Sequence, residues 1–211
     1  MTIQTSYLNV LGPISASTAT TTNITSGWQT VLQQYIKMAN NHDLLIGAYF
    51  ETGLYTSTTV SSKNMITDTS TATASIKIRA LVDGVEAAPG EVVYGKRTQQ
   101  LSATLEGAIS GCLSIVTNSA GGQQIVLNTN CVAPEVISLL QDTVSANSFL
   151  FAAPGLSSGQ HNIEIQAKID AMGDNQNGTF TAAGFLGKGA LTAESVRVAK
   201  DPVYPYVIPM D

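Results

Sequence analysis

The segment "HNIEIQAKIDA", residues 161–171, alternates apolar and polar side chains without interruption. Successive side chains of a β-strand point to opposite faces, so a period of two predicts a strand with one buried face. We expect Ile163, Ile165 and Ile169 to be core residues of a central strand. The face predicted to be buried comprises His161, Ile163, Ile165, Ala167 and Ile169, and the opposite face comprises Asn162, Glu164, Gln166 and Lys168.

Similar alternation occurs in several other segments of the chain. It is clear at residues 72–82 and can be followed at 27–38, 44–52 and 90–109. Residues 27–38 also fit a helical period, but the surrounding β pattern favours a strand. Short alternating segments separated by Gly, Asn, Asp and Pro are typical of β-sandwiches and β-barrels.

Turn signals refine this pattern. Asp83-Gly84 predicts a tight turn between two strands. Residues 177–200 predict two further strands joined by a turn at Gly187–Lys188–Gly189. We therefore predict an all-β fold, a single jelly-roll-like β-sandwich of about eight to ten strands.

One segment departs from the β pattern. In "PEVISLLQDTV", residues 134–144, a proline followed by glutamate is typical of a helix start, so we predict a short helix there. The predicted organisation has three parts. Residues 1–26 form a Thr/Ser-rich arm or lead-in strand, residues 27–200 the sandwich, and residues 201–211 a Pro-rich apolar arm.

Both cysteines of the chain lie at the ends of a predicted hairpin, residues 112–131. Folding this segment about Ala120-Gly121-Gly122 places Cys112 opposite Cys131 and Val116 opposite Leu127. Opposed residues in an antiparallel pair meet the Cα separation that a disulfide requires. We predict a Cys112–Cys131 disulfide, which indicates an oxidising environment. Two buried free thiols are the alternative.

Composition limits the classes of function. Charged residues make up only 12% of the chain and the net charge is −5. An acidic chain without basic clusters lacks the electrostatic footprint of a nucleic-acid-binding protein. No apolar run approaches the length of a membrane-spanning helix, and the N-terminus shows no signal peptide. A weakly charged, Thr-rich surface favours an extracellular location or burial in an assembly.

Catalytic motifs are not evident. His161 falls on the predicted buried face, and His42 lies beside Asp43 in a turn. Neither histidine has a flanking nucleophile motif, so we predict that the protein is not an enzyme. No resident cofactor is expected. The one candidate cation site is a calcium site with oxygen ligands Asp170, Asp174, Asn175 and Asn177, whose spacing is not that of an EF-hand.

The C-terminal segment "KDPVYPYVIPMD", residues 200–211, combines three prolines with apolar side chains. Prolines prevent regular strand pairing and favour an extended chain. An apolar extended segment must be buried either against its own domain or against a neighbour. The residues of this candidate assembly arm are Val203, Tyr204, Tyr206, Val207, Ile208 and Met210.

These features predict a non-enzymatic structural protein whose main partner is another copy of itself. The predicted product is an extracellular filament, surface layer or matrix, or a virion, built through β-sandwich packing and extended arms. The alternative is a β-sandwich module that binds a carbohydrate or a surface receptor, for which this architecture is a common scaffold.

Overall fold

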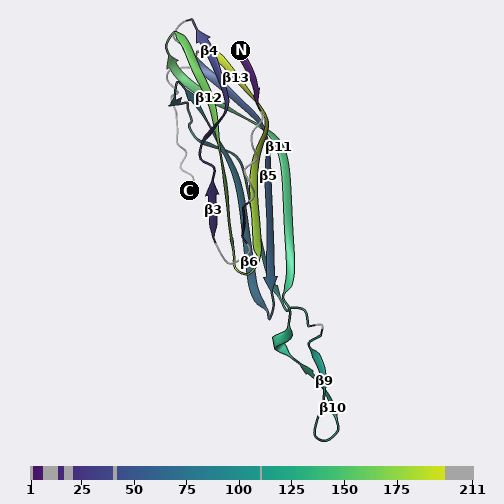
Figure 1. Cartoon of the computed structure of the whole chain (residues 1–211). Coiled ribbons are helices and arrows are strands. Elements are labelled where there is room, and N and C mark those ends of the chain that lie inside the picture. The colour runs from purple at the N-terminus through teal and green to yellow at the C-terminus, as the bar shows by residue number, and fades with distance from the viewer. Residues whose placement is uncertain (1, 7–13, 17–20, 40–41, 110, 198–211) are drawn as a thin grey trace, which may run out of the picture.

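The computed structural model describes residues 2–6, 14–16, 21–39, 42–109 and 111–197 of the chain. Within them two antiparallel sheets form an elongated β-sandwich, and a small hairpin projects from one end (Figure 1). Sheet I contains β1 (Thr2–Ser6), β2 (Ile14–Ala16), β13 (Thr179–Val196), β5 (His42–Ser62) and β11 (Glu135–Leu156). Sheet II contains β3 (Thr22–Thr25), β4 (Gln29–Met38), β12 (Gly159–Asn175), β6 (Ile66–Val82), β7 (Val85–Glu86) and β8 (Val92–Leu105).

The strand pairing follows the order of a jelly roll. Strands up to β6 pair with strands from β8 onward in reverse order: β6 with β8, β5 with β11, β3 and β4 with β12, and β1 and β2 with β13. The pairs β13–β5 and β12–β6 then join these ribbons within the two sheets. An antiparallel ribbon wound in this way is the jelly-roll arrangement, which confirms the predicted fold class.

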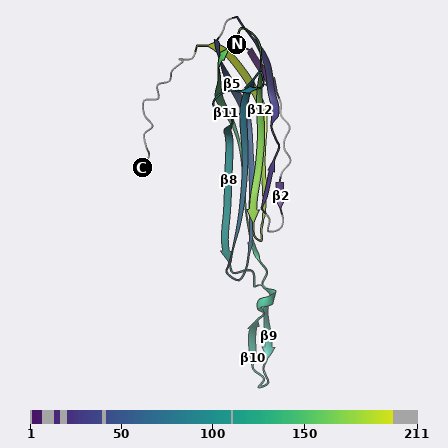
Figure 2. The ribbon, with the colours of Figure 1, turned by 90° about the vertical axis from the view of Figure 1, so that its left-hand side faces the viewer.

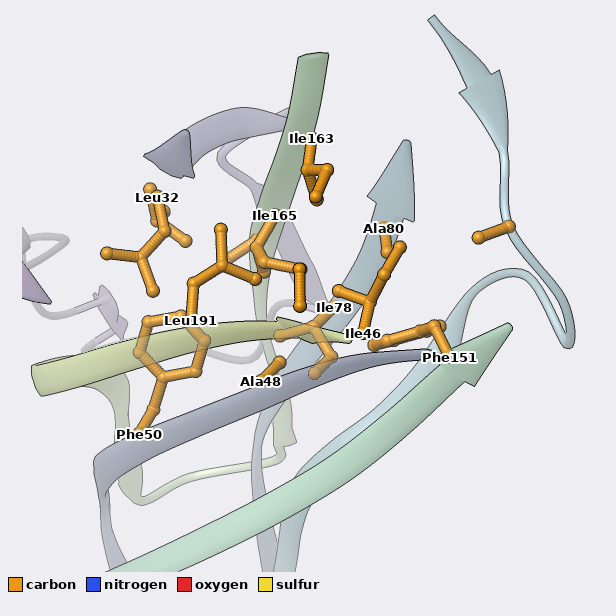
Figure 3. Packing of buried hydrophobic residues seen from close by; sticks show 14 of the residues in the cluster. Leu32, Ile46, Ala48, Phe50, Ile78, Ala80, Phe151, Ile163, Ile165 and Leu191 are labelled. Atoms are coloured by element: carbon orange, nitrogen blue, oxygen red, sulfur yellow. The ribbon is translucent and has the colours of Figure 1, made fainter. Parts of the chain in front are cut away.

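The strand over residues 161–171 is confirmed as a central strand. β12 lies between β6 on one side and β3 and β4 on the other. All five residues of the predicted inward face are buried, and Ile163 and Ile165 are completely inaccessible to solvent. Figure 3 shows these two side chains packed among Leu32, Ile78 and Leu191 between the sheets. The period of two in the sequence therefore identified the core face correctly.

Toward the hairpin end, the space between the sheets changes from aliphatic to small and polar. Thr56, Thr58 and Asp68 are buried there, beside a small cluster of alanines around Phe180. Gln99 of β8 is also buried and crosses the sandwich. Its amide oxygen accepts the Thr56 hydroxyl at 2.9 Å, and its nitrogen donates to Thr58 Oγ1 at 2.7 Å and the Leu139 carbonyl at 2.6 Å. Hydrogen bonds thus link the sheets where aliphatic packing ends.

The predicted turn at Asp83-Gly84 is confirmed. It connects β6 to β7, and both residues have positive φ, 52° for Asp83 and 83° for Gly84. A two-residue turn of this kind needs positive φ at both positions, which Asp tolerates and Gly adopts freely. The strand predicted over residues 27–38 is also confirmed, as β4.

Two local predictions are wrong. The segment 134–144 is not a helix, because residues from Glu135 onward form β11; the one helical turn in the described residues is η1 (Thr129–Cys131). The predicted turn at residues 187–189 is instead an irregularity within the continuous strand β13, whose register against β5 shifts between Leu186 and Gly189.

The structure describes part of the predicted N-terminal arm and none of the predicted C-terminal arm. In the N-terminal segment 1–26, the described residues supply edge strands to both sheets: β1 and β2 pair with β13, and β3 pairs with β12. The C-terminal arm, residues 201–211, lies outside the described residues.

Candidate assembly interface

The two cysteines form a disulfide at the base of the projecting hairpin. Cys112 and Cys131 are bonded, with their Cα atoms 5.5 Å apart. The strands of the hairpin are β9 (Leu113–Thr117) and β10 (Gln123–Leu127). Figures 1 and 2 show the hairpin extending beyond the end of both sheets. The predicted disulfide is therefore present.

The register that suggested the disulfide is nevertheless wrong. Val116 pairs with Gln124, not with Leu127, and the Cys112 carbonyl accepts the N–H of Asn128. Cys131 lies three residues further along the chain. The helical turn η1 takes up these three residues, with the Asn128 side chain accepting the N–H of Asn130, and returns Cys131 to Cys112.

The hairpin exposes aliphatic side chains on both faces. Ile115 and Ile125 face each other across its strands and are 68% and 70% exposed. Every residue of β9 and β10 is exposed. A two-stranded hairpin by itself is only marginally stable in water. Exposed aliphatic surfaces of this kind are normally sites of contact with another molecule. The exposed large aliphatic residues are Leu113, Ile115, Val116, Ile125, Val126 and Leu127.

A second aliphatic surface adjoins the hairpin on β11. Residues 135–146 of this strand are exposed on both faces. β11 is the last strand of sheet I, and it lies at the same margin of the sandwich as β8, the outer strand of sheet II (Figure 2). We call β9, β10 and residues 135–146 together the hairpin-end surface. On β11 its large aliphatic residues are Val136, Ile137, Leu139, Leu140 and Val144.

His161 is held in place by two hydrogen-bond acceptors. It is 5% exposed, with Nδ1 2.7 Å from Asp83 Oδ2 and Nε2 2.9 Å from the Ser157 carbonyl. Both partners accept hydrogen bonds, so the protonated ring, in which both nitrogens donate, satisfies both contacts. The hydrogen bond to Asp83 and that to the Ser157 carbonyl raise the pKa of His161, and the bond to His161 lowers the pKa of Asp83. The Asp83 carboxylate and the Ser157 carbonyl together fix the orientation of the ring.

We expect the stability of the protein to fall as the pH rises past His161's folded pKa. That pKa lies above the unfolded value of about 6.5, so the contribution is complete below about pH 6.5 and is lost above the raised pKa. Urea denaturation between about pH 5 and pH 9 measures the free energy of unfolding. A His161→Gln control should have a flatter profile over this range. Parallel profiles for the two proteins would contradict the assignment.

The candidate calcium ligands do not converge. Asp170 lies 3.6 Å from Lys77 Nζ, and Asp174 accepts a hydrogen bond from Thr21 Oγ1. The two carboxylates are four positions apart along β12, about 13 Å. Asn175 points into the sandwich and Asn177 belongs to the following turn, where its N–H donates to Asp68. No group of three His, Cys, Asp or Glu side chains in the described residues could hold a metal ion.

Among the described residues, a surface depression and an aromatic side chain are candidates for contact with a small ligand. A shallow depression of about 540 Å³ on sheet I is lined by Tyr49, Glu51, Asn147 and Lys188 among others. The half-buried Trp28 is less available, because the Arg79 guanidinium and the Lys168 ammonium lie 4.4 and 4.7 Å from its ring centre. A sugar stacking on this ring would compete with these cations.

Fold and surface together define a jelly-roll β-sandwich protein with an aliphatic surface at one end. No protein-family model matches the chain, and no curated protein matches it. None of the described helical residues forms a span long and apolar enough to cross a membrane.

Solved structures give only remote similarity. A chain from the structure of the infectious bursal disease virus Gt strain has 8% sequence identity and a TM-score of 0.19, covering 98% of this chain and 44% of that one. The VP2 subviral particle of the same virus has 10% identity and a TM-score of 0.12, covering 97% and 44%. The chain thus spans less than half of these proteins.

Proposed function

We propose that this protein is a non-enzymatic structural subunit that assembles with copies of itself through the hairpin-end surface. The observation that carries the proposal is the concentration of exposed aliphatic side chains on β9, β10 and the first half of β11. The core of the sandwich is already complete without them, since the large buried side chains lie between the sheets. Contiguous exposed aliphatic surface of this kind is a signature of a protein–protein contact.

Low charge supports the same proposal. With 12% charged residues the chain has about half the usual share, so little electrostatic repulsion opposes contact between copies. The disulfide at the base of the hairpin stabilises the projecting segment by restricting its unfolded conformations. It also favours an oxidising location, which an extracellular filament, surface layer or matrix, or a virion after release, provides.

The test is the mass of the full-length protein in solution. Sedimentation velocity should show a species larger than the 22.1 kDa monomer whose population grows with concentration. Lysines in place of both Ile115 and Ile125 should shift this population to the monomer, because two charges cannot be buried unpaired in an aliphatic contact. The matched control carries lysines at Thr117 and Gln123, the neighbouring cross-strand pair.

The control pair adds the same charge to the same hairpin without removing aliphatic area, so its mass distribution should stay close to that of the parent. A parent protein that remains monomeric at every concentration would contradict the proposal. Equal dissociation by both lysine pairs would show that charge alone, and not the loss of aliphatic contact, separates the copies.

A carbohydrate- or receptor-binding module is the second candidate. The depression on sheet I favours it, because Tyr49 offers a ring and Glu51, Asn147 and Lys188 offer hydrogen-bonding groups for a sugar. A glycan array probed with the parent protein and a Tyr49→Ala variant tests this function. Binding that requires Tyr49 would support it, and an array without signal would contradict it.

A further inference from the structure

The free edge of β11 has a defined pattern of backbone groups. Ala152 exchanges two hydrogen bonds with Ala88, each 2.9 Å long, on the side of β11 that faces away from β5. The register between β11 and β5 is continuous from Glu135 to Ala153. Because alternate residues of a strand direct their N–H and C=O groups to opposite sides, the even-numbered residues point to the free edge.

Hydrogen bonds on the other side confirm this assignment. The carbonyls of Leu139, Ser145 and Asn147 accept from side chains of Gln99, Thr52 and Tyr94, which lie between the sheets or on β5. These three odd-numbered carbonyls are therefore turned away from the edge. Among the described residues, no strand pairs with the outer side of β11 between residues 136 and 150.

The side chains on the outer face of this edge repeat every four residues. Val136, Leu140 and Val144 are 61%, 60% and 55% exposed, and all three belong to the even-numbered set. Ser138 and Asp142 lie between them. The order Val, Ser, Leu, Asp, Val places the aliphatic residues symmetrically about Leu140. A surface with this symmetry can match a second copy of itself across a two-fold axis.

We propose that two copies of the chain pair through β11 in antiparallel orientation, with the two-fold axis at Leu140. Val136 of each copy then faces Val144 of the other, and Leu140 faces its own equivalent. Sheet I continues from one copy into the other over residues 135–145, a contact about 33 Å long. This inference rests on the proposed function and specifies one of its contacts.

Backbone and charge patterns both fit this register. Even-numbered residues face even-numbered residues, so each facing pair exchanges two N–H···O=C bonds. Asp142 faces Ser138 of the second copy, and Glu135 faces Ser145. An axis at Asp142 would instead place two carboxylates opposite each other, which is destabilising. An axis at Ser138 would shorten the paired part of β11 to residues 135–141 and place Asp142 opposite Pro134, which precedes the strand and has no N–H to donate.

The C-terminal arm fits this edge less well than a second β11 does. Its prolines stand at positions 202, 205 and 209. An added strand directs alternate residues to the edge, so either Pro202 or both Pro205 and Pro209 would face β11 without an N–H. The copy of β11 has no proline between residues 135 and 153.

Cross-linking through a single introduced cysteine tests the axis. Both natural cysteines are in the disulfide, so Leu140→Cys supplies the one free thiol of the chain. At the axis the two Cα atoms lie about 5.5 Å apart, within the range for a disulfide. Mild oxidation should shift the non-reducing gel band from 22.1 kDa to twice that mass, reversibly on reduction.

Val136→Cys is the matched control. It exposes a thiol on the same face of the same strand, but its equivalent in the second copy lies eight residues away, about 27 Å. It should remain monomeric on the gel alone and form a dimer when mixed with Val144→Cys. Equal cross-linking of Val136→Cys and Leu140→Cys in separate samples would overturn the proposal.

A proline variant tests the backbone contact. The N–H of Leu140 points to the free edge, so Leu140→Pro removes no bond to β5, and the far-ultraviolet circular dichroism should match the parent. The Leu140→Pro variant should have a lower mass in sedimentation than the parent protein.

Three outcomes separate the proposed function from the proposed β11 contact. A monomeric parent overturns both, and a multimeric parent without cross-links at Leu140→Cys overturns this one alone. If the β11 variants keep the multimer and deletion of residues 201–211 abolishes it, the contact is made by the C-terminal arm.

Discussion

Replacement of Ile165 by Asp is expected to abolish folding. Ile165 lies in the middle of β12, is completely buried, and packs between the sheets with Leu32 and Leu191. A carboxylate at this position would be surrounded by aliphatic side chains without a charged or hydrogen-bonding partner. The cost of burying an unpaired charge is comparable to the whole stability of a domain, about 5–15 kcal/mol. Circular dichroism and urea denaturation measure the loss.

Two variants accompany this experiment. Ile165→Ala should lower the free energy of unfolding by about 2–5 kcal/mol, through lost transfer energy and the cavity that remains. Glu164→Ala changes the neighbouring residue on the solvent face and should cost about 0–1 kcal/mol, since its hydrogen bonds to Thr30 and Asn162 are on the surface. An Ile165→Asp protein with the parent's denaturation midpoint would show that the facing of β12 is wrong.

Replacement of Asp68 by Ala is expected to have the second largest effect. Asp68 of β6 is completely buried. Its Oδ2 accepts the N–H of Ser61 at 2.6 Å, and its Oδ1 accepts the N–H of Asn177 at 3.0 Å. Removing the carboxylate leaves two backbone donors without a partner, each at a cost of about 1–3 kcal/mol. We expect the free energy of unfolding to fall by about 2–6 kcal/mol.

Asp68→Asn and Glu86→Ala are the controls in the same urea experiment. Asn retains one acceptor oxygen, so Asp68→Asn should lose about half as much stability as Asp68→Ala. Glu86 is exposed on β7, and its removal should change stability by about 0.5 kcal/mol or less. Equal losses in the free energy of unfolding for Asp68→Ala and Glu86→Ala would show that Asp68 is not the link between β5 and the turn before β13.

In the cysteine hairpin, the local sequence pattern predicts the disulfide but not the strand register. Its ends predicted the correct disulfide, but the register was displaced by three residues. The predicted register assumed that both strands run without interruption to the cysteines. The turn η1 interrupts the second strand after Asn128 and takes up the difference. A turn of this kind is stabilised by one local side-chain bond, which a periodicity argument does not include.

The wrong helix at residues 134–144 has a physical explanation as well. The prediction depends on Pro134 followed by Glu135, and the four-residue spacing of Val136, Leu140 and Val144 does not contradict it, because this spacing also occurs along one face of a helix. In β11 the same residues lie on the outer face of an edge strand, where both faces are accessible to solvent. Burial on one face is what imposes the period of two, so an exposed edge strand carries no such signal.

The sequence alone determined the all-β class and the inward face of β12 through its periodicity, and the turn at Asp83-Gly84 through its residue types. These features depend on side chains within a few residues of one another, because strand alternation and turn geometry are local. Tertiary structure alone decided that β11 is an edge, that Asp68 and Gln99 are buried, and that His161 is paired with Asp83. Each of these depends on groups far apart in the chain, such as Asn177 with Asp68 and Gln99 with Leu139. Burial and hydrogen-bond pairing are properties of the folded arrangement, and no short stretch of sequence contains both partners.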